Sequence, residues 1–182
     1  MPMNAETGST AEVQESPPGF RWWHPLIGRN PKATLIRAVS IAVVCFIFFR
    51  FVALPVRVRG VSMEPTYRNG KVNLINRLSY LGAQPRRGDV VGVTFTGESV
   101  QLLKRIIALP GETFRISGGV VHIDGNPLDE PYTSLNESWT TKTEKTLGSF
   151  EYVVIGDNRS MGMNLHTWGV VDRSRIVGKA VF

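Results

Sequence analysis

The sequence has few of the residues that build disulfides and metal sites. Its 182 residues include one cysteine, Cys45, which excludes an intrachain disulfide and a cysteine-based zinc site. Its three histidines, His24, His122 and His166, belong to no cluster with metal-ligand spacing, and no glycine-rich phosphate loop precedes a helical segment. The acidic stretch DGNPLDEPY, residues 124–132, lacks the residue order of an EF-hand, so we interpret it as a turn. We therefore expect no metal and no other cofactor.

Acidic residues are absent from one part of the chain. Residues 16–37 carry four basic residues and no acidic one, whereas residues 57–182 carry 16 basic and 12 acidic residues. The net charge of +6 by itself would suit either nucleic acid or anionic lipid. Because the charges after Arg57 are mixed and form no dense basic tract, they disfavour a nucleic-acid binder. A basic segment beside a membrane explains the distribution better.

The one long hydrophobic run extends from Ala33 to Val56, about the length that crosses a bilayer as a helix. Arg37 and Arg50 interrupt it, and both side chains can extend toward the membrane interfaces, while Pro55 is expected to end the helix. A buried core helix is the alternative. A cleavable signal peptide is disfavoured because no small-x-small site follows the run.

These features divide the chain into three predicted parts. Residues 1–32 are expected in the cytoplasm, because basic residues precede the span, and the first 19 or so have the composition of a disordered tail. Residues 33–56 are the predicted transmembrane helix, and residues 57–182 are the predicted extracytoplasmic β-rich domain.

Six short runs rich in Val, Ile, Leu and Phe predict strands in that domain: KVNLINRL, GDVVGVTF, SVQLLKRIIAL, ETFRIS, GVVHIDG and FEYVVIG. Gly118 and Gly119 predict a two-residue hairpin turn between ETFRIS and GVVHIDG. No sustained helical periodicity follows the hydrophobic run. The fold class is therefore predicted to be mainly β, a small antiparallel β-barrel or sandwich behind one N-terminal transmembrane helix.

Ser62 and Lys104 are the side chains that could form a nucleophile and its base. Ser62 lies in RGVSMEPTYRNG, shortly after the hydrophobic run, and Lys104 lies in the apolar run VQLLKRIIALPG. Burial disfavours an ammonium ion and lowers its pKa, which would let a buried lysine take the proton of a serine hydroxyl. On this run alone, a lysine that protects an exposed sheet edge is an equally good interpretation. His24 is expected across the membrane from Ser62, and His122 is interpreted as a half-buried strand histidine.

Four motifs, GVSMEPT, RGDVV, LLKRIIALPGE and GDNR followed by WG, stand in the order and spacing of type I signal peptidases, the membrane-bound Ser/Lys endopeptidases. The chain resembles that family from Pro55 to Phe182. The resemblance implies a serine endopeptidase with Ser62 as nucleophile and Lys104 as general base. It also implies a catalytic domain on the outer face of the bacterial cytoplasmic membrane. The implied substrates are exported preproteins, cut after small-x-small sites such as Ala-x-Ala.

The resemblance implies supporting roles for eight further residues. The backbone N–H of Ser62 would stabilise the oxyanion, in a loop shaped by Gly60, Met63 and Pro65. Structural support of the site is expected from Arg105, Gly156, Asp157, Asn158 and Arg159. For the charged members of this set, an ion-pair role is favoured over direct chemistry.

The segment GDNRSMGMNLHTWG departs from the family pattern. Aligned without gaps, Gly162 stands where many members have the serine that orients the lysine, Asn164 replaces an aspartate, and His166 replaces an arginine. Ser160, Asn164 or an ordered water is expected to hold Lys104 instead. We interpret His166 first as a surface or loop histidine, and second as a substitute orienting group or a pH-sensitive element. Gly60 replaces a serine that helps to bind the oxyanion in some members.

Two other functions stay open on the sequence. The chain could be a divergent processing peptidase with a narrow substrate, or a non-catalytic membrane-anchored paralogue. A self-cleaving Ser/Lys repressor is disfavoured, because the hydrophobic run stands where its DNA-binding domain would be. The expected partners are preproteins and membrane lipid but not nucleic acid, and the sequence leaves the oligomeric state open.

Overall fold

The computed structural model describes residues 30–95, 101–133 and 138–181. The predicted N-terminal tail and His24 lie outside the described residues. The chain divides into two units, residues 1–43 and residues 44–182, and the second unit holds every described strand.

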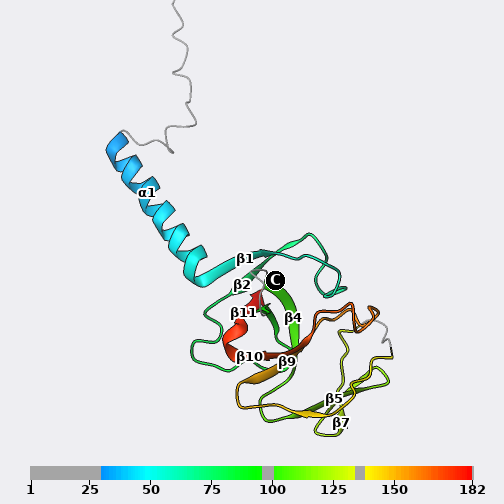
Figure 1. Cartoon of the computed structure of the whole chain (residues 1–182). Coiled ribbons are helices and arrows are strands. Elements are labelled where there is room, and N and C mark those ends of the chain that lie inside the picture. The colour runs from blue at the N-terminus through cyan, green and yellow to red at the C-terminus, as the bar shows by residue number, and fades with distance from the viewer. Residues whose placement is uncertain (1–29, 96–100, 134–137, 182) are drawn as a thin grey trace, which may run out of the picture. The chain divides into compact units, whose positions relative to one another are not determined.

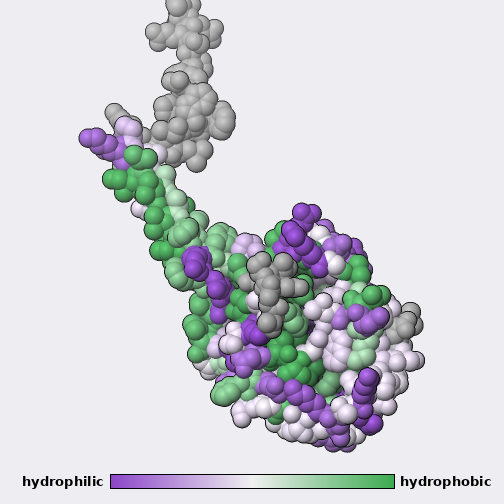
Figure 2. All heavy atoms as spheres, in the orientation of Figure 1, coloured by the Kyte–Doolittle hydropathy of each residue, from purple (hydrophilic) through white to green (hydrophobic). Residues whose placement is uncertain are grey.

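The described chain begins with helix α1, Pro31–Ile47, which continues as the π-helical segment η1, Phe48–Val52. Figure 2 shows a mostly hydrophobic surface along this helix, and none of its side chains is buried. By length and composition, Pro31–Val52 could cross a membrane. The sequence left open that this segment is a buried core helix, and its exposed side chains contradict that alternative.

The C-terminal boundary of this helix differs from the prediction. The helical segment was expected to reach Val56, but strand β1, Ala53–Arg57, begins directly after η1. β1 lies at the edge of its sheet, where a proline that lacks an N–H group is tolerated. Pro55 is therefore part of a strand, and Leu54 and Val56 pack against a hydrophobic cluster of the β domain.

Two antiparallel sheets form the β domain (Figure 1). The larger sheet has seven strands in the order β1-β2-β11-β3-β4-β9-β10. Its further members are β2, Val72–Asn76; β3, Val90–Thr94; β4, Gln101–Ala108; β9, Glu151–Ile155; β10, Gly169–Asp172; and β11, Ile176–Val181, preceded by the 3₁₀ turn η2, Arg173–Arg175. No pairing of β1 with β10 closes this sheet among the described ladders, so the architecture is two open sheets.

The smaller sheet has four strands in the order β7-β6-β5-β8. They are β5, Thr113–Ser117; β6, Val120–Ile123; β7, Asn126–Pro127; and β8, Lys145–Thr146. Ser117 pairs with Val120, so Gly118 and Gly119 form the predicted two-residue turn, and both have positive φ. One hydrophobic cluster joins this sheet to the larger one, through Phe114 and Val121 on one side and Ile107 and Ile155 on the other.

The mainly β fold class is confirmed, and all six predicted strands are present. The sequence missed β1, β7, β8, β10 and β11, of which β11 is the most consequential because it lies between β2 and β3. β11 contains Gly178, where an added Cβ would lie 2.2 Å from the Asn76 carbonyl oxygen. The close approach of two strands requires glycine there, and that glycine interrupts the apolar pattern from which a strand is recognised.

Candidate active site

Ser62 lies on the loop between β1 and β2. Two buried residues of this loop, Met63 and Tyr67, pack with Val58 and Leu103 in a hydrophobic cluster and so fix the loop to the sheet. Gly60 has a φ of +90°, and its N–H donates to the Asn69 side chain at 3.1 Å. The peptide bond between Glu64 and Pro65 is cis. The loop is thus anchored on both sides of Ser62.

Lys104 lies on β4, which pairs with β3 on one side and β9 on the other. The edge-strand interpretation of this lysine is therefore wrong. Its side chain is 1% exposed, and its Nζ donates to the Ser62 Oγ at 2.8 Å. Burial is the main cause that lowers the pKa of Lys104 to about 8, although the nearby Asp157 carboxylate opposes this shift.

Arg105 and Asp157 form a two-pronged ion pair next to Lys104. The guanidinium donates from Nε to Oδ1 at 2.8 Å and from Nη2 to Oδ2 at 2.6 Å, and the Asp157 side chain is 1% exposed. The Thr66 hydroxyl donates to Oδ2 of the same carboxylate at 2.5 Å, which ties the Ser62 loop to this pair. Burial lowers the pKa of Arg105, but the hydrogen bonds to Asp157 and the charge of its carboxylate outweigh this, so the pKa of Arg105 is raised overall.

A second buried ion pair joins Arg159 to Glu130, with an Nη2–Oε1 distance of 2.5 Å. The Tyr132 hydroxyl donates to Oε1 of the same Glu130, and the Tyr132 ring lies 4.0 Å from the Arg105 guanidinium. Segment 124–132 was interpreted only as a turn. It does contain the turn between β6 and β7, but it also supplies a buried counter-ion and an aromatic contact to the site.

The turn from Gly156 to Asn158 contacts the backbone of the Ser62 loop directly. The N–H of Asn158 donates to the Ser62 carbonyl at 3.0 Å, and its side-chain amide donates to the Val61 carbonyl at 3.0 Å. At Gly156, an added Cβ would lie 2.1 Å from the Ser62 carbonyl oxygen. Only glycine allows this approach, so the turn holds Ser62 opposite Lys104.

The altered segment places its three unusual residues differently. His166 lies in a loop, as expected, but it is not a surface residue: it is 4% exposed, and its Nε2 accepts the N–H of Gly156 at 3.0 Å. Asn164 is exposed, and the Ser160 hydroxyl donates to Asn158 rather than to the lysine. Among the described residues, the Lys104 amine makes its hydrogen bond to Ser62. His122 is partly buried on β6, as predicted.

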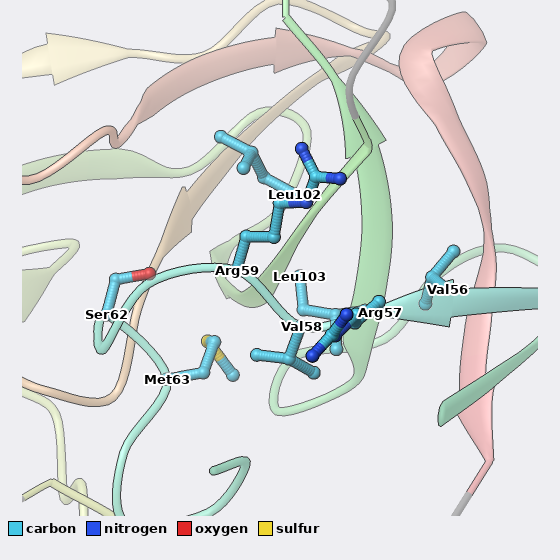
Figure 3. A pocket seen from close by; sticks show the side chains of 8 residues that line it. All are labelled: Val56, Arg57, Val58, Arg59, Ser62, Met63, Leu102 and Leu103. Carbon is cyan, nitrogen blue, oxygen red and sulfur yellow. The ribbon is translucent and has the colours of Figure 1, made fainter. Parts of the chain in front are cut away.

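A pocket opens beside Ser62, between β1, the Ser62 loop and β4 (Figure 3). Its apolar walls are Val56, Val58, Met63, Leu102 and Leu103, and Arg57 and Arg59 complete the lining. Its volume of about 310 Å³ includes the open space at its mouth. The pocket is therefore small, lies next to the hydroxyl, and combines apolar walls with two arginines.

Neither the sequence nor the site suggests a metal. In residues 30–95, 101–133 and 138–181, no group of three or more His, Cys, Asp or Glu side chains could hold an ion. Six of the ten predicted site residues meet around one turn: Ser62, Lys104, Arg105, Gly156, Asp157 and Asn158.

Sequence reasoning missed Thr66, Glu130, Tyr132 and Trp139. Thr66 lies four residues after Ser62, within the GVSMEPT motif, and was not assigned a role. Glu130 could have been suspected from the buried charge of Arg159, which needs a counter-ion. Tyr132 and Trp139 have no local signal in the sequence, because their contacts depend on how the smaller sheet packs.

A mainly β domain that pairs a serine hydroxyl with a buried lysine amine has the arrangement of a serine hydrolase that uses lysine as its base.

Comparisons with known proteins identify a family within this class of hydrolases. Residues 32–182 match the family model described as "Signal peptidase, peptidase S26". The chain is 32% identical to the probable signal peptidase I-2 of Synechocystis, over 94% of this chain and 77% of that protein. It is 34% identical to the signal peptidase I of Leptolyngbya laminosa, over 84% of this chain and 79% of that protein. A solved signal peptidase I from Enterococcus faecalis is 27% identical, with a TM-score of 0.43 over 53% of this chain and 96% of that one.

The chain therefore belongs to the signal peptidase family, peptidase S26. This confirms the predicted family and the predicted class of enzyme, a serine endopeptidase of the signal peptidase I type. The N-terminal apolar helix agrees with membrane anchoring.

Proposed function

We propose that this chain is a single-pass membrane endopeptidase that removes signal peptides with a Ser62–Lys104 dyad. The observation that carries the proposal is the 2.8 Å hydrogen bond between the Ser62 hydroxyl and the amine of Lys104, which is 1% exposed. A solvated lysine is almost wholly protonated at neutral pH, but burial lowers the pKa of Lys104 to about 8. A useful fraction of the amine is therefore neutral and able to accept a proton.

The reaction follows from these two groups. Neutral Lys104 takes the proton of Ser62 as Oγ attacks the scissile carbonyl, and the resulting ammonium returns that proton to the leaving amine. Lys104, neutral again, then takes a proton from the water that attacks the acyl-enzyme carbonyl, and returns it to the Ser62 Oγ as the ester bond breaks and the acid product leaves. The developing oxyanion would be stabilised mainly by backbone donors such as the Ser62 N–H, because Gly60 brings no hydroxyl to the loop.

The pocket beside Ser62 supports a preference for small residues before the cleaved bond. Five of its lining residues are apolar, and they lie close to the hydroxyl, so a small apolar side chain would be desolvated against them and a large one excluded. An Ala-x-Ala site fits this shape. The basic residues before the helix support a cytoplasmic N-terminus, with the β domain on the other side of the bacterial cytoplasmic membrane and in contact with its lipid.

The first experiment is cleavage of a preprotein with an Ala-x-Ala site by the detergent-solubilised chain, beside the Ser62→Ala and Lys104→Ala variants. Ser149→Ala and Lys142→Ala, which change exposed residues, are matched controls. We expect cleavage by the parent and both controls and none by either dyad variant. The parent's rate should rise with pH through about 8, because the base must be neutral to act.

Cleavage that survives in Ser62→Ala or Lys104→Ala would exclude the dyad. A folded parent that cuts no Ala-x-Ala preprotein but rescues processing of one particular exported protein in cells would indicate the narrow-substrate alternative. Rescue by the Ser62→Ala variant as well would indicate a non-catalytic paralogue.

A further inference from the structure

His166 is a buried, titratable side chain that the proposed reaction does not use. It lies in the loop between β9 and β10, and its ring packs edge-on against Trp139, with centroids 5.1 Å apart. Many family members are expected to have an arginine here. The replacement places a smaller group that need not be charged behind the active-site turn.

The hydrogen bond of His166 defines its tautomer. A backbone N–H can only donate, so the 3.0 Å bond from Gly156 requires an unprotonated Nε2. The neutral ring then carries its proton on Nδ1. Nδ1 is buried and has no hydrogen-bond partner among the described residues.

Gly156 contacts both His166 and the backbone of Ser62. An added Cβ at Gly156 would lie 2.1 Å from the Ser62 carbonyl oxygen and 2.5 Å from His166 Nε2. The same carbonyl accepts the N–H of Asn158, and the Gly156 carbonyl accepts from Arg159 Nε at 3.0 Å. The imidazole and the Ser62 carbonyl therefore contact the turn at the same residue, and the hydrogen bond from the Gly156 N–H to His166 helps to fix the position of that turn.

The charges around His166 keep it neutral. Burial is the main cause that lowers the pKa of His166 to about 3, and the positive charges of Lys104 on β4 and Arg159 on its own loop add to the effect. The Asn158 carbonyl opposes it weakly. Arg159 is paired with Glu130, and Asp157 with Arg105, so neither carboxylate is available to the imidazole. A neutral ring places no second cation beside the base.

We propose that His166 is a positioning residue of the Ser62–Lys104 dyad. Its Nε2 accepts the Gly156 N–H and so fixes the turn, which keeps Ser62 next to Lys104 and excludes water from the contact between their side chains. The inference rests on the proposed function for its catalytic consequence. Its structural part, the dependence of the Lys104 environment on His166, does not require any substrate to be cut.

The test compares His166→Phe with His166→Gln. Phenylalanine keeps a flat ring against Trp139 but offers no acceptor, so the Gly156 amide must find water or move. Glutamine can offer its side-chain oxygen to the same amide. His122→Phe, on the exposed side of the smaller sheet, is the control for loss of a histidine. Circular dichroism and thermal unfolding establish that each variant is folded.

The first readout is direct titration of the Lys104 amine by NMR of the solubilised full chain with isotope-labelled lysine, with Lys104→Ala assigning the signal. Water that enters in His166→Phe would stabilise the ammonium, so we expect the Lys104 pKa to rise by about one unit or more toward its ordinary value. His166→Gln should remain closer to the parent, and His122→Phe should equal it.

The second readout is cleavage. In His166→Phe, kcat should fall by about 10- to 100-fold with little change in KM, because small displacements of reacting groups cost rates of this order. The rising limb of the pH profile should move to higher pH, and glutamine should restore part of both losses. An unchanged Lys104 titration in a folded His166→Phe would overturn the proposal, whether or not cleavage is seen. If that titration shifts while cleavage is independent of Ser62, the positioning role stands and the proposed function fails.

Discussion

Lys104 and Arg105 are neighbours on β4, yet their surroundings shift the pKa values of the two side chains in opposite directions. Arg105 meets a buried carboxylate in a two-pronged ion pair, which raises its pKa. Lys104 meets a neutral hydroxyl among apolar side chains, and burial lowers its pKa to about 8. The same strand therefore carries a permanent cation on one face and a potential base on the other. Both side chains are largely buried, so the opposite directions of the two pKa shifts come from their partners, a carboxylate for Arg105 and a hydroxyl for Lys104.

Lys104→Arg removes the difference between the two side chains and is expected to cause the largest loss of activity. A guanidinium stays protonated at any pH at which proteins function, so the strand would then carry two permanent cations and no base. We expect kcat/KM to fall by about 10⁴-fold or more, the scale of losing the base of a serine protease. Preprotein cleavage measures it, with Lys142→Arg as control. A variant that keeps a tenth of the parent's activity would rule out Lys104 as the base.

Asp157→Asn tests the other side of the comparison. It leaves the Arg105 cation buried without its counter-ion, and breaking such a pair costs about 3–5 kcal/mol of unfolding free energy. It also removes the negative charge that raises the pKa of Lys104, so the rising limb of activity should move to lower pH. Urea unfolding and a pH profile measure the two effects.

Lys145→Gln is the matched control for this change, because the Lys145–Glu151 pair is exposed, at 48% and 36%. Water screens such pairs, so we expect a much smaller loss of stability from Lys145→Gln than from Asp157→Asn. Equal losses in the two variants would mean that the Arg105–Asp157 pair contributes no more than a surface contact.

Gly156→Ala probes the turn that holds Ser62 opposite Lys104. The added methyl group would lie 2.1 Å from a backbone oxygen, so the turn or the loop must shift, at a cost of about 1–3 kcal/mol. Cleavage should fall with stability, because the shift separates Oγ from Nζ. Gly148→Ala is the control, since its Cβ would meet the Glu151 side chain at an ordinary 3.6 Å. Thermal unfolding that is the same for both variants would contradict the close contact.

Gly162→Ala and Gly162→Ser should have the smallest effect. The new Cβ would lie 3.0 Å from the side-chain oxygen of Asn164, which is exposed and free to move aside. Because Gly162 does not have a positive φ, alanine can stabilise the fold by about 0.4–1 kcal/mol through the unfolded state. We expect the two variants to cleave at the same rate. A serine variant much faster than the alanine variant would show that a hydroxyl at this position does reach Lys104.

Local patterns in the sequence predicted most of the larger strands and all of the close hairpin. Alternation and β-branched residues predicted β2 to β6 and β9, and Gly118–Gly119 predicted the turn. The pattern failed to predict β11, where the close approach of the Asn76 backbone requires glycine at position 178. It also failed at β1, whose apolar residues continue the apolar run of the helix. Both failures concern strands whose character depends on what lies beside them.

The candidate site divides in the same way. The sequence by itself determined the hydroxyl at Ser62, the lysine within an apolar run, the GDNR motif and the hydrophobic helix, because these depend on residue type and spacing. Only the tertiary structure decided that β4 is an interior strand, that Glu130 and Tyr132 complete the charge network, and that His166 lies behind Gly156. The physical reason is that burial and ion pairing are properties of contacts between distant segments. An arginine is a cation in any surroundings, whereas a lysine becomes a base only when the fold buries it beside a neutral partner.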